Sequence, residues 1–259
     1  MSSGERNPTN KALEALVEKA GVAKHVLEDT ERVVCDDVWT EERARLAREL
    51  LSKDTSTIPE FWQSASKHEP SSVSLSCFCQ RNLTQLLIHR LHVVPPQKQP
   101  LYDEARVAAS VCDITKDALP ADALANGGVD FALCLFCLSA LHPDTMKGAV
   151  KKVVAAIKPG GKLFFRDYGR YDQAQLRFRS GHKLQENFYV RQDNTRAYYF
   201  TTEEVQEIFT EAGLVPVENE YIRRQYANRQ QSVVRFRVWI HAIFEKPALD
   251  SGVAVTDAA

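Results

Sequence analysis

The chain has 259 residues, of which 44% are hydrophobic and 26% are charged, and its formal net charge is −1. This length and composition suit one α/β domain with extensions, or two small domains, with a real buried core. Because the net charge is near zero, any affinity for RNA must come from a local basic patch rather than from an overall field. No apolar run reaches the roughly 18 residues that a membrane helix needs, which excludes a predicted membrane span.

The cysteines and the N-terminal sequence indicate a reducing compartment. Six cysteines are too sparse for a disulfide scaffold. Cys134 and Cys137 form a CxxC spacing inside the apolar run FALCLFCLSAL, so a buried strand explains them better than a metal or redox pair. The first residues, MSSGERNPTNKALEALVEKAG, contain no apolar signal core. We therefore expect a cytoplasmic or nuclear protein with no metal site.

Residues 1–58 are predicted to form a helical N-terminal extension. Apolar residues recur at helical spacing between Leu13 and Ala20. The stretch WTEERARLARELL predicts a second helix, with Thr40 as its N-cap and two glutamates in its first turn. Such helices are expected to form an arm or an outer pair around the main domain.

Strands and helices alternate from Tyr102 onward. The expected elements are strands at Arg106–Val111 and Val129–Ser139, a helix at Asp144–Ile157, a strand at Lys162–Phe165, a helix at Thr202–Ala212, and strands at Val215–Tyr221 and Ser232–Phe244. The KPGG sequence at 158–161 is predicted to stop the first of these helices and turn the chain. This order predicts an open α/β sheet over residues 59–247, mostly parallel with an antiparallel last strand. A disordered tail is expected at 248–259.

Polar side chains follow three of the predicted strands. They are Asp113, Ser139 with His142, and the pair Arg166 and Asp167. Ligands of open α/β sheets bind at the carboxyl ends of the strands. Each residue alone could be an ordinary loop residue, but three such positions at successive strand ends favour a ligand site.

The stretch from Lys162 to Phe200 is both basic and aromatic. It holds ten of the 23 aromatic residues, and eight Lys or Arg against four Asp or Glu. Arginines can contact phosphates while rings stack on unpaired bases, so this composition suits a base-exposed nucleic acid. A strand and a surface loop whose rings close the core would give the same composition.

Several segments resemble a known family. The order of elements, with KPGG before a strand, resembles the class I S-adenosylmethionine-dependent methyltransferases, which have a Rossmann-like sheet. The segments LYDEARVAASVCDIT, LCLFCLSALHPDTM, FRDYGRYDQAQLRF, ENFYVRQDNTRAYYFT and RVWI resemble the tRNA 3-methylcytidine methyltransferases. This close match spans about residues 100–247. The segment VWTEERARLARELL and the pair Phe61-Trp62 show a weaker resemblance to the same family. The resemblance implies transfer of a methyl group from S-adenosylmethionine to a cytidine in the anticodon loop of tRNA.

The resemblance also implies which residues bind the cofactor. Asp113 would accept a hydrogen bond from the adenine amine, Ile114 would cover a face of the adenine ring, and Leu135 would lie near the cofactor. Trp62 matches an aromatic residue that packs on the cofactor, but a core role is an equal alternative. The tyrosine expected four residues later is Ser66 here.

The substrate residues implied by the resemblance lie in the basic and aromatic stretch. Arg166, Asp167 and Tyr168 would form the catalytic cytosine pocket together with Arg191 and Arg196. Asp167 would accept from the cytosine amino group and so help to select cytosine. The residues expected to grip the RNA are Arg170, Arg177, Arg191 and Arg196. The family also implies a helper, either a seryl-tRNA synthetase or a tRNA-binding accessory protein.

The glycine-rich cofactor turn of the family is missing. Between Gly21 and Gly127 the chain has no glycine, so the first βαβ unit is expected to be degenerate, with residues 67–99 atypical. Residues 73–79 could form a strand and Leu83–Leu91 a helix, as a glycine-free substitute. Alternatively, residues 67–99 are foreign to the fold, through altered splicing or a shifted reading frame. The alternative to an active enzyme is a catalytically inactive tRNA-binding or interaction protein that has lost cofactor binding, and a third possibility is an unfolded product with no activity.

Overall fold

The structure is a computed structural model that describes residues 34–36, 39–52, 75–80, 85–90, 107–179, 181–228 and 233–248. Contacts within the chain group it into two compact units. Unit 1 comprises Met1–Ser71, Asp167–Thr202 and Glu220–Ile240, and unit 2 comprises Ser72–Arg166, Glu203–Asn219 and His241–Ala259. None of the described helices is long and apolar enough to cross a membrane.

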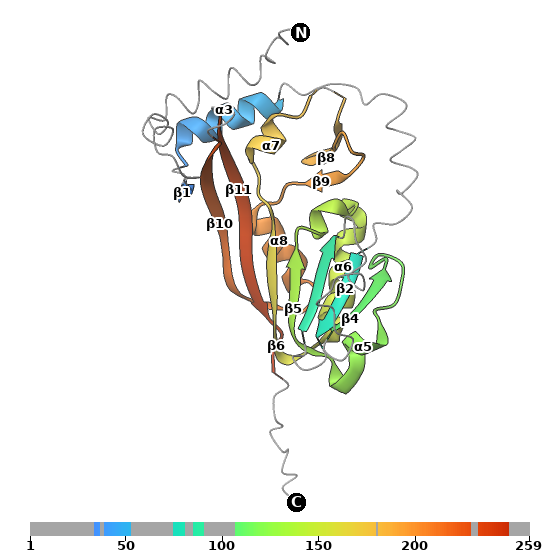
Figure 1. The fold of residues 1–259 in the computed structure, drawn as a ribbon. Coiled ribbons are helices and arrows are strands. Elements are labelled where there is room, and N and C mark those ends of the chain that lie inside the picture. The colour runs from blue at the N-terminus through green and yellow to red at the C-terminus, as the bar shows by residue number, and fades with distance from the viewer. Residues whose placement is uncertain are drawn as a thin grey trace, which may run out of the picture. The chain divides into compact units, whose positions relative to one another are not determined.

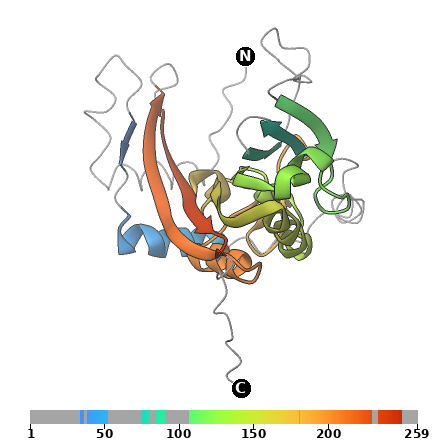
Figure 2. The same ribbon diagram turned by 90° about the horizontal axis from the view of Figure 1, so that it is seen from below.

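The main sheet has eight strands in the order β1–β10–β11–β6–β5–β3–β2–β4 (Figure 1). The strands are β1 (Val34–Asp36), β2 (Leu75–Gln80), β3 (Gln85–Arg90), β4 (Val107–Cys112), β5 (Val129–Leu135), β6 (Ile157–Tyr168), β10 (Val215–Asn228) and β11 (Val233–Glu245). Strand β5 runs parallel to β3 and to β6, whereas β2 is antiparallel to β3 and to β4. The expected α/β class is confirmed, with a mixed sheet. Figures 1 and 2 both show β10 and β11 running side by side as a long pair.

Strands β2 and β3 replace the first βαβ unit with a hairpin. The helix predicted at Leu83–Leu91 is wrong, because residues 85–90 form β3 and pair with β5 from Gln85↔Phe131 to His89↔Leu135. A crossover between parallel strands needs a dozen or more residues, usually a helix. Residues 81–84 are too few for one, so β2 enters the sheet in the opposite direction. The hairpin therefore fills two interior sheet positions, between β5 and the edge strand β4, without a crossover helix.

Two helices of unit 2 pack through aromatic and charged contacts. They are α6 (Pro143–Ala156) and α8 (Thr202–Thr210). The Phe209 ring of α8 lies edge-on to Phe165, 5.2 Å between centroids, and 4.8 Å from Phe244. Lys147 of α6 places its Nζ 2.9 Å from carboxylate oxygens of both Glu207 and Glu211. The apolar contacts fix α8 to strands β6 and β11, and the ion pairs tie α6 to α8.

Most predicted elements are present with shifted ends. Strand β5 stops at Leu135 because Phe136 has a φ of 51°, and a short 3-10 helix, Leu138–Ala140, follows. The predicted helix end before KPGG is confirmed, because α6 ends at Ala156. KPGG itself belongs to β6, whose pairing with β5 shifts register between Ile157 and Lys162. Gly160 adopts a φ of 78° there, and its N–H donates to the Lys246 carbonyl at 2.8 Å. Hydrogen bonding thus continues on the Lys246 side of β6, whereas the pairing with β5 is interrupted at KPGG.

The N-terminal prediction is confirmed only in part. Helix α3 (Glu41–Ser52) begins after Thr40, whose Oγ1 accepts from the Arg43 N–H at 3.3 Å, as the sequence predicted. Residues 34–36, expected within a helical extension, form β1 and pair antiparallel with β10. The first predicted helix, at 13–20, and the tail from 249 onward lie outside the described residues.

Unit 1 has a core that joins α3 to α7 (Gln173–Leu176) and β11. Ala47, Leu176 and Phe236 form its buried centre. Trp39 stacks on Tyr171 at its edge, with ring centroids 5.7 Å apart. A separate three-stranded sheet completes the unit, with strands β7 (Lys183–Gln185), β8 (Phe188–Val190) and β9 (Arg196–Tyr198).

Gly169 lies where the end of β6 meets β11. Its N–H donates to the Val238 carbonyl at 2.9 Å. A Cβ atom added here would lie 2.9 Å from Val238 Cγ1 and 3.3 Å from Tyr221 Cδ1. Both distances are shorter than ordinary van der Waals contact, so only glycine permits this approach.

We expect Gly169→Ala to lower the free energy of unfolding by about 1–3 kcal/mol, because the added methyl overpacks a buried contact. The matched control is Gly148→Ala in α6, where an added Cβ meets nothing within 4 Å. That change should raise stability by about 0.5–1 kcal/mol, since alanine favours the helix. Urea unfolding followed by circular dichroism measures both, and equal effects would contradict the close approach at Gly169.

Candidate functional site

In unit 2, a turn built on Asp113 follows strand β4. Asp113 Oδ1 accepts from the Thr115 N–H at 3.0 Å and from Thr115 Oγ1 at 2.6 Å. The Asp113 N–H donates to Asp117 Oδ2 at 2.7 Å. Asp113 Oδ2 lies 3.8 Å from Lys116 Nζ, a long ion pair. The carboxylate is therefore held in place by one oxygen and keeps acceptor capacity on the other.

The surroundings of Asp113 keep it ionised. Burial raises the pKa of its carboxyl, but the two hydrogen bonds from Thr115 and the charge of Lys116 outweigh that effect, so the pKa lies below its ordinary value. An anionic acceptor at this strand end suits a donor such as an exocyclic amine. The neighbouring Ile114 is buried, with 3% of its surface exposed.

The end of strand β5 carries the other predicted positions of unit 2. Leu135 is half-buried, and the next residue, Phe136, donates its N–H to the Arg166 carbonyl at 2.7 Å. Ser139 is buried, and His142 caps α6 by accepting from the Asp144 N–H on Nδ1 at 3.4 Å. His142 therefore has a capping role at the start of α6, which the sequence left open.

The CxxC pair is buried as expected. Cys134 and Cys137 are free thiols with Sγ atoms 3.1 Å apart, and both have at most 5% exposure. Among the described residues, no group of three or more His, Cys, Asp and Glu side chains is placed to hold a metal ion.

S-adenosylmethionine fits the described part of unit 2 at its adenosine end only. Asp113 and Ile114 provide a carboxylate acceptor and an apolar side chain after β4. The family's glycine-rich turn should follow a central parallel strand, which here is β3, ending at Arg90. No glycine lies between Gly21 and Gly127, so nothing in the sequence provides the same close backbone approach. Trp62 lies outside the described residues.

In unit 1, two arginines lie over the ring of Tyr168. The guanidinium carbon of Arg191 is 4.9 Å from the ring centroid, and that of Arg237 is 5.8 Å from it. Tyr199 is fully buried beside them, 5.7 Å from the Tyr168 ring. Burial raises the pKa of Tyr199 and outweighs the opposing charges of Arg191 and Arg237. The cluster is cationic, with two arginines near a partly exposed tyrosine ring.

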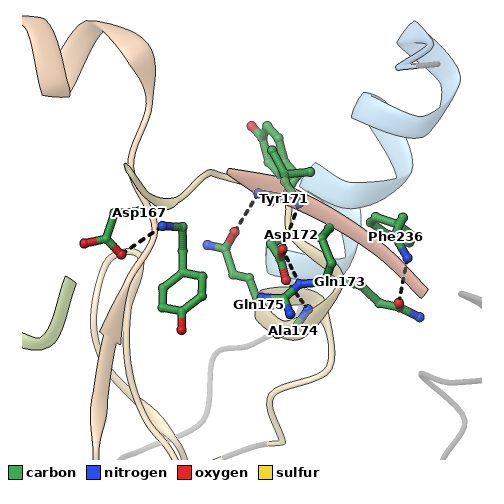
Figure 3. A network of polar contacts seen from close by, with 10 residues as sticks. Asp167, Tyr171, Asp172, Gln173, Ala174, Gln175 and Phe236 are labelled. Carbon is green, nitrogen blue, oxygen red and sulfur yellow. Dashed lines mark hydrogen bonds and ion pairs between the residues drawn. The ribbon is translucent and has the colours of Figure 1, made fainter. Parts of the chain in front are cut away.

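Asp167 is fully buried at the end of β6. Its Oδ1 accepts from the Tyr168 N–H at 2.9 Å (Figure 3). The structure therefore places this predicted catalytic carboxylate beside the backbone of Tyr168, and Arg166 precedes it on β6 as a half-buried side chain.

A second buried carboxylate, Asp172, organises the residues around this cluster. Its Oδ2 accepts from Arg237 Nε and from the Val238 N–H, both at 2.8 Å, and its Oδ1 accepts from the Ala174 N–H at 2.7 Å (Figure 3). Burial raises the pKa of the Asp172 carboxyl, with the Arg237 charge opposing the rise. The sequence offered no signal for this role beyond an aspartate inside GRYDQ.

The four arginines predicted to bind RNA differ in exposure. Arg177 is exposed, Arg191 and Arg170 are half-buried, and Arg196 is 8% exposed. Arg170 donates from Nε to the Tyr199 carbonyl at 3.0 Å, and Arg196 lies 5.8 Å from the centre of the Phe188 ring. The structure brings all four into one unit, and only Arg177 among them extends fully to solvent.

A family match agrees with the α/β fold, the Asp113 turn of unit 2 and the Tyr168 cluster of unit 1. Residues 46–219 match the model of a methyltransferase domain. The chain belongs to this methyltransferase family.

Curated relatives include RNA-modifying and other methyltransferases. The chain is 44% identical over 151 residues to tRNA N(3)-cytidine methyltransferase METTL6 of Pongo abelii, a match that covers 58% of this chain and 53% of that protein. It is 45% identical over 150 residues to human METTL2B, another tRNA N(3)-cytidine methyltransferase, covering 58% of the chain and 39% of the relative. O-methyltransferase 3 of Dictyostelium discoideum is 40% identical over 161 residues, a match that covers 61% of this chain and 36% of that protein. The chain thus spans about half the length, or less, of these relatives.

Solved structures with a similar course of the chain include 1,6-didemethyltoxoflavin-N1-methyltransferase of Burkholderia thailandensis. The match covers 85% of this chain and 97% of that one, with 15% identity and a TM-score of 0.40.

The turn at Asp113 gives a testable pH dependence. Thr115→Val removes the Oγ1 donor but leaves the backbone N–H donor, so the pKa of Asp113 should rise toward its ordinary value of about 3.9. A depressed carboxyl pKa stabilises the fold above the unfolded pKa, and this stabilisation is lost as the pH falls through the folded pKa. Thr115→Val should therefore cost stability at neutral pH and cost less in acid.

Carboxyl NMR titration and urea unfolding across pH measure the two effects. Thr210→Val is the matched control, because its Oγ1 donates to the Gln206 carbonyl of α8, away from Asp113. An unchanged Asp113 titration in Thr115→Val would remove the proposed hydrogen-bond cause.

Proposed function

We propose that this chain methylates N3 of a cytidine in the anticodon loop of tRNA, with S-adenosylmethionine as the methyl donor. The observation that carries the proposal is the identity of 42–45% to several tRNA N(3)-cytidine methyltransferases over about 150 residues. The fold adds a carboxylate acceptor after β4 and a cationic, aromatic cluster in unit 1, which together suit an adenosine and an RNA base.

The chemistry requires little acid–base catalysis from the chain. Cytosine N3 carries a free lone pair at neutral pH, and bound S-adenosylmethionine supplies a methyl group on a sulfonium. The chain's residues would orient the base and exclude water from the reacting atoms. Because N3 lies on the pairing edge, the cytosine must be unpaired or flipped out before it reacts.

We assign the cofactor to Asp113, Ile114 and Leu135 of unit 2. The base and its strand are assigned to residues of unit 1 and the adjoining end of β6, namely Arg166, Asp167, Tyr168, Arg170, Arg177, Arg191 and Arg196. A seryl-tRNA synthetase or a tRNA-binding accessory protein is the proposed helper, and the cytoplasm or nucleus is the proposed compartment. Free buried thiols at Cys112, Cys134 and Cys137 agree with a reducing environment.

A second candidate is a tRNA-binding protein without methyltransferase activity. The observation that favours it is the β2–β3 hairpin, which stands where the cofactor-binding βαβ unit is expected and lacks glycine. Such a protein would keep the basic and aromatic surface of unit 1 and bind tRNA without regard to cofactor.

Binding of S-adenosylhomocysteine, the reaction product, separates the two candidates. We expect isothermal titration to show binding to the whole chain, and Asp113→Ala to weaken it about tenfold through loss of a charge-assisted hydrogen bond. Asp122→Ala, an exposed aspartate of the same unit, is the control. Methylation of tRNA, measured as 3-methylcytidine by mass spectrometry, should likewise fall in Asp113→Ala and stay at the wild-type level in Asp122→Ala. A folded chain that binds tRNA but not the cofactor product would refute the enzyme proposal.

Selection of cytosine by Asp167 gives a separate prediction. In Asp167→Asn, the Oδ1 acceptor for the Tyr168 N–H is retained, but the side chain gains a donor that would oppose the cytosine amine. We expect the preference of binding for a cytidine over a uridine at the target position to fall about tenfold or more. Glu220→Gln, an exposed change in unit 1, should leave it unaltered. An unchanged preference in Asp167→Asn would remove this role.

A further inference from the structure

Unit 1 contains two hollows lined by cationic side chains, and their cations differ in how far they are already paired. The first hollow, of about 370 Å³, is lined by residues that include Arg48, Arg170 and Lys183. Arg48 lies 3.7 Å from the Glu41 carboxylate, and Lys183 lies 3.9 Å from that of Glu186. Each cation of this hollow therefore has a partner within the protein.

The second hollow, of about 470 Å³, is lined by Ala174, Arg177, Phe178, Arg179, His182 and residues 191–193. We call it the basic hollow. Arg177 and Arg179 are exposed, and neither forms an ion pair or a side-chain hydrogen bond with the described residues. Three arginines face one aspartate, so its net charge is 3 − 1 = +2 with His182 neutral. Arg177 and Arg179 are therefore available for an anion from outside, whereas Arg191 lies over the Tyr168 ring.

An aromatic ring lies between the two exposed arginines. Phe178 is half-buried and stacks on Tyr189, with centroids 4.6 Å apart and planes 9° from parallel. The His182 ring lies near the Phe178 ring, with centroids 6.3 Å apart. Its Nδ1 is 2.9 Å from the Val190 carbonyl, and because a carbonyl can only accept, that nitrogen carries the proton. The rings are thus anchored to β8 and line the hollow beside the charges.

The opposite side of the hollow is a closed hairpin loop between β8 and β9. The Arg191 N–H donates to the Thr195 carbonyl at 2.7 Å, and the Asn194 N–H donates to the Arg191 carbonyl at 3.0 Å. Asp193 is occupied locally, because its Oδ1 accepts from the Thr195 N–H at 3.0 Å. The loop is therefore preorganised, and its one acidic side chain already has a donor.

We propose that the basic hollow binds one unpaired nucleotide of the RNA strand, at a position other than the methylated cytidine. Arg177 and Arg179 contact its flanking phosphates, and the base packs against the Phe178 side of the hollow. The volume lies in the range of about 300–1,000 Å³ that small-molecule sites occupy. Exposed arginines beside an aromatic ring are the combination that binds single strands through phosphate contact and stacking, with little dependence on sequence. This inference rests on the proposed function, and it adds an RNA contact that no cofactor residue shares.

The test is fluorescence anisotropy of the whole chain, without cofactor, on a labelled RNA hairpin with an unpaired anticodon-type loop. Arg177→Gln/Arg179→Gln should weaken binding about tenfold or more and make the slope of log K against log salt shallower by about 1.4, which is 0.7 for each lost phosphate contact. Phe178→Leu should weaken binding about fivefold or more through lost stacking. The melting temperature of each variant checks that the fold is kept.

Arg45→Gln/Lys151→Gln is the matched control, since it removes two exposed cations outside the hollow. It should leave affinity and slope within about twofold of wild type. A fully paired RNA duplex should bind equally to wild type and Phe178→Leu, because its bases cannot stack on a protein ring.

The outcomes separate this inference from the proposed function. Loss of hairpin binding in the Arg177 and Arg179 variant supports the basic hollow, whether or not the chain methylates tRNA. If Arg177→Gln/Arg179→Gln binds the hairpin with the affinity and salt slope of wild type, the basic-hollow inference is overturned, even if the chain methylates tRNA. Equal competition by polyglutamate and by the hairpin would also overturn it, because it would indicate a general polyanion surface.

Discussion

The buried carboxylate of Asp172 is the constraint on which most of unit 1 depends. A carboxylate without water needs several donors, and Asp172 receives three, from Arg237, Val238 and Ala174. These bonds tie α7 to strand β11 and hold Arg237 beside the Tyr168 ring. Removing one partner of a buried pair costs about 3–5 kcal/mol, because the other charge stays buried and unpaired.

The side chains next to Asp172 extend the same connection in both directions. Gln173 Oε1 accepts from the Phe236 N–H at 3.0 Å, and Gln175 Oε1 accepts from the Tyr171 N–H at 2.7 Å (Figure 3). Gln175 also donates to Asn187 Oδ1 at 3.2 Å, at the start of β8. Short polar residues in one turn therefore fix two strands and the residues that line the basic hollow. The polar residues of GRYDQAQLRF support the fold, and the exposed Arg177 and Arg179 near its end can contact a ligand.

Unit 2 combines an altered sheet with an intact turn after strand β4. A single hairpin, β2–β3, occupies two sheet positions that the family fills with crossover units, and β3 still runs parallel to β5. The turn after β4 is intact, with Asp113 held by Thr115. The turn that we propose for the adenosine end of the cofactor is therefore present, whereas the sequence has no glycine for the turn expected after β3. This contrast is the physical reason why cofactor binding and RNA binding need to be measured separately.

The sequence alone determined the class of the fold and most of its elements. Amphipathic spacing located α3, α6 and α8, continuous apolar runs located β5 and the core of β6, and motif resemblance identified the methyltransferase family. These signals are local, because each depends on the order of residues along one segment. They also named Asp113, Tyr168 and Arg191, which the structure places in the turn after β4 and in the aromatic cluster of unit 1.

The tertiary structure decided what depends on pairing between distant segments. Residues 85–90 look helical by composition, yet they form a strand because β5 offers an edge in register. KPGG is a turn signal that became part of β6, since Gly160 donates to the Lys246 carbonyl across the sheet. Likewise Asp172, Arg179 and His182 have no distinguishing pattern in the sequence. Their roles follow from donors and rings contributed by segments far along the chain, which only the fold brings within contact distance.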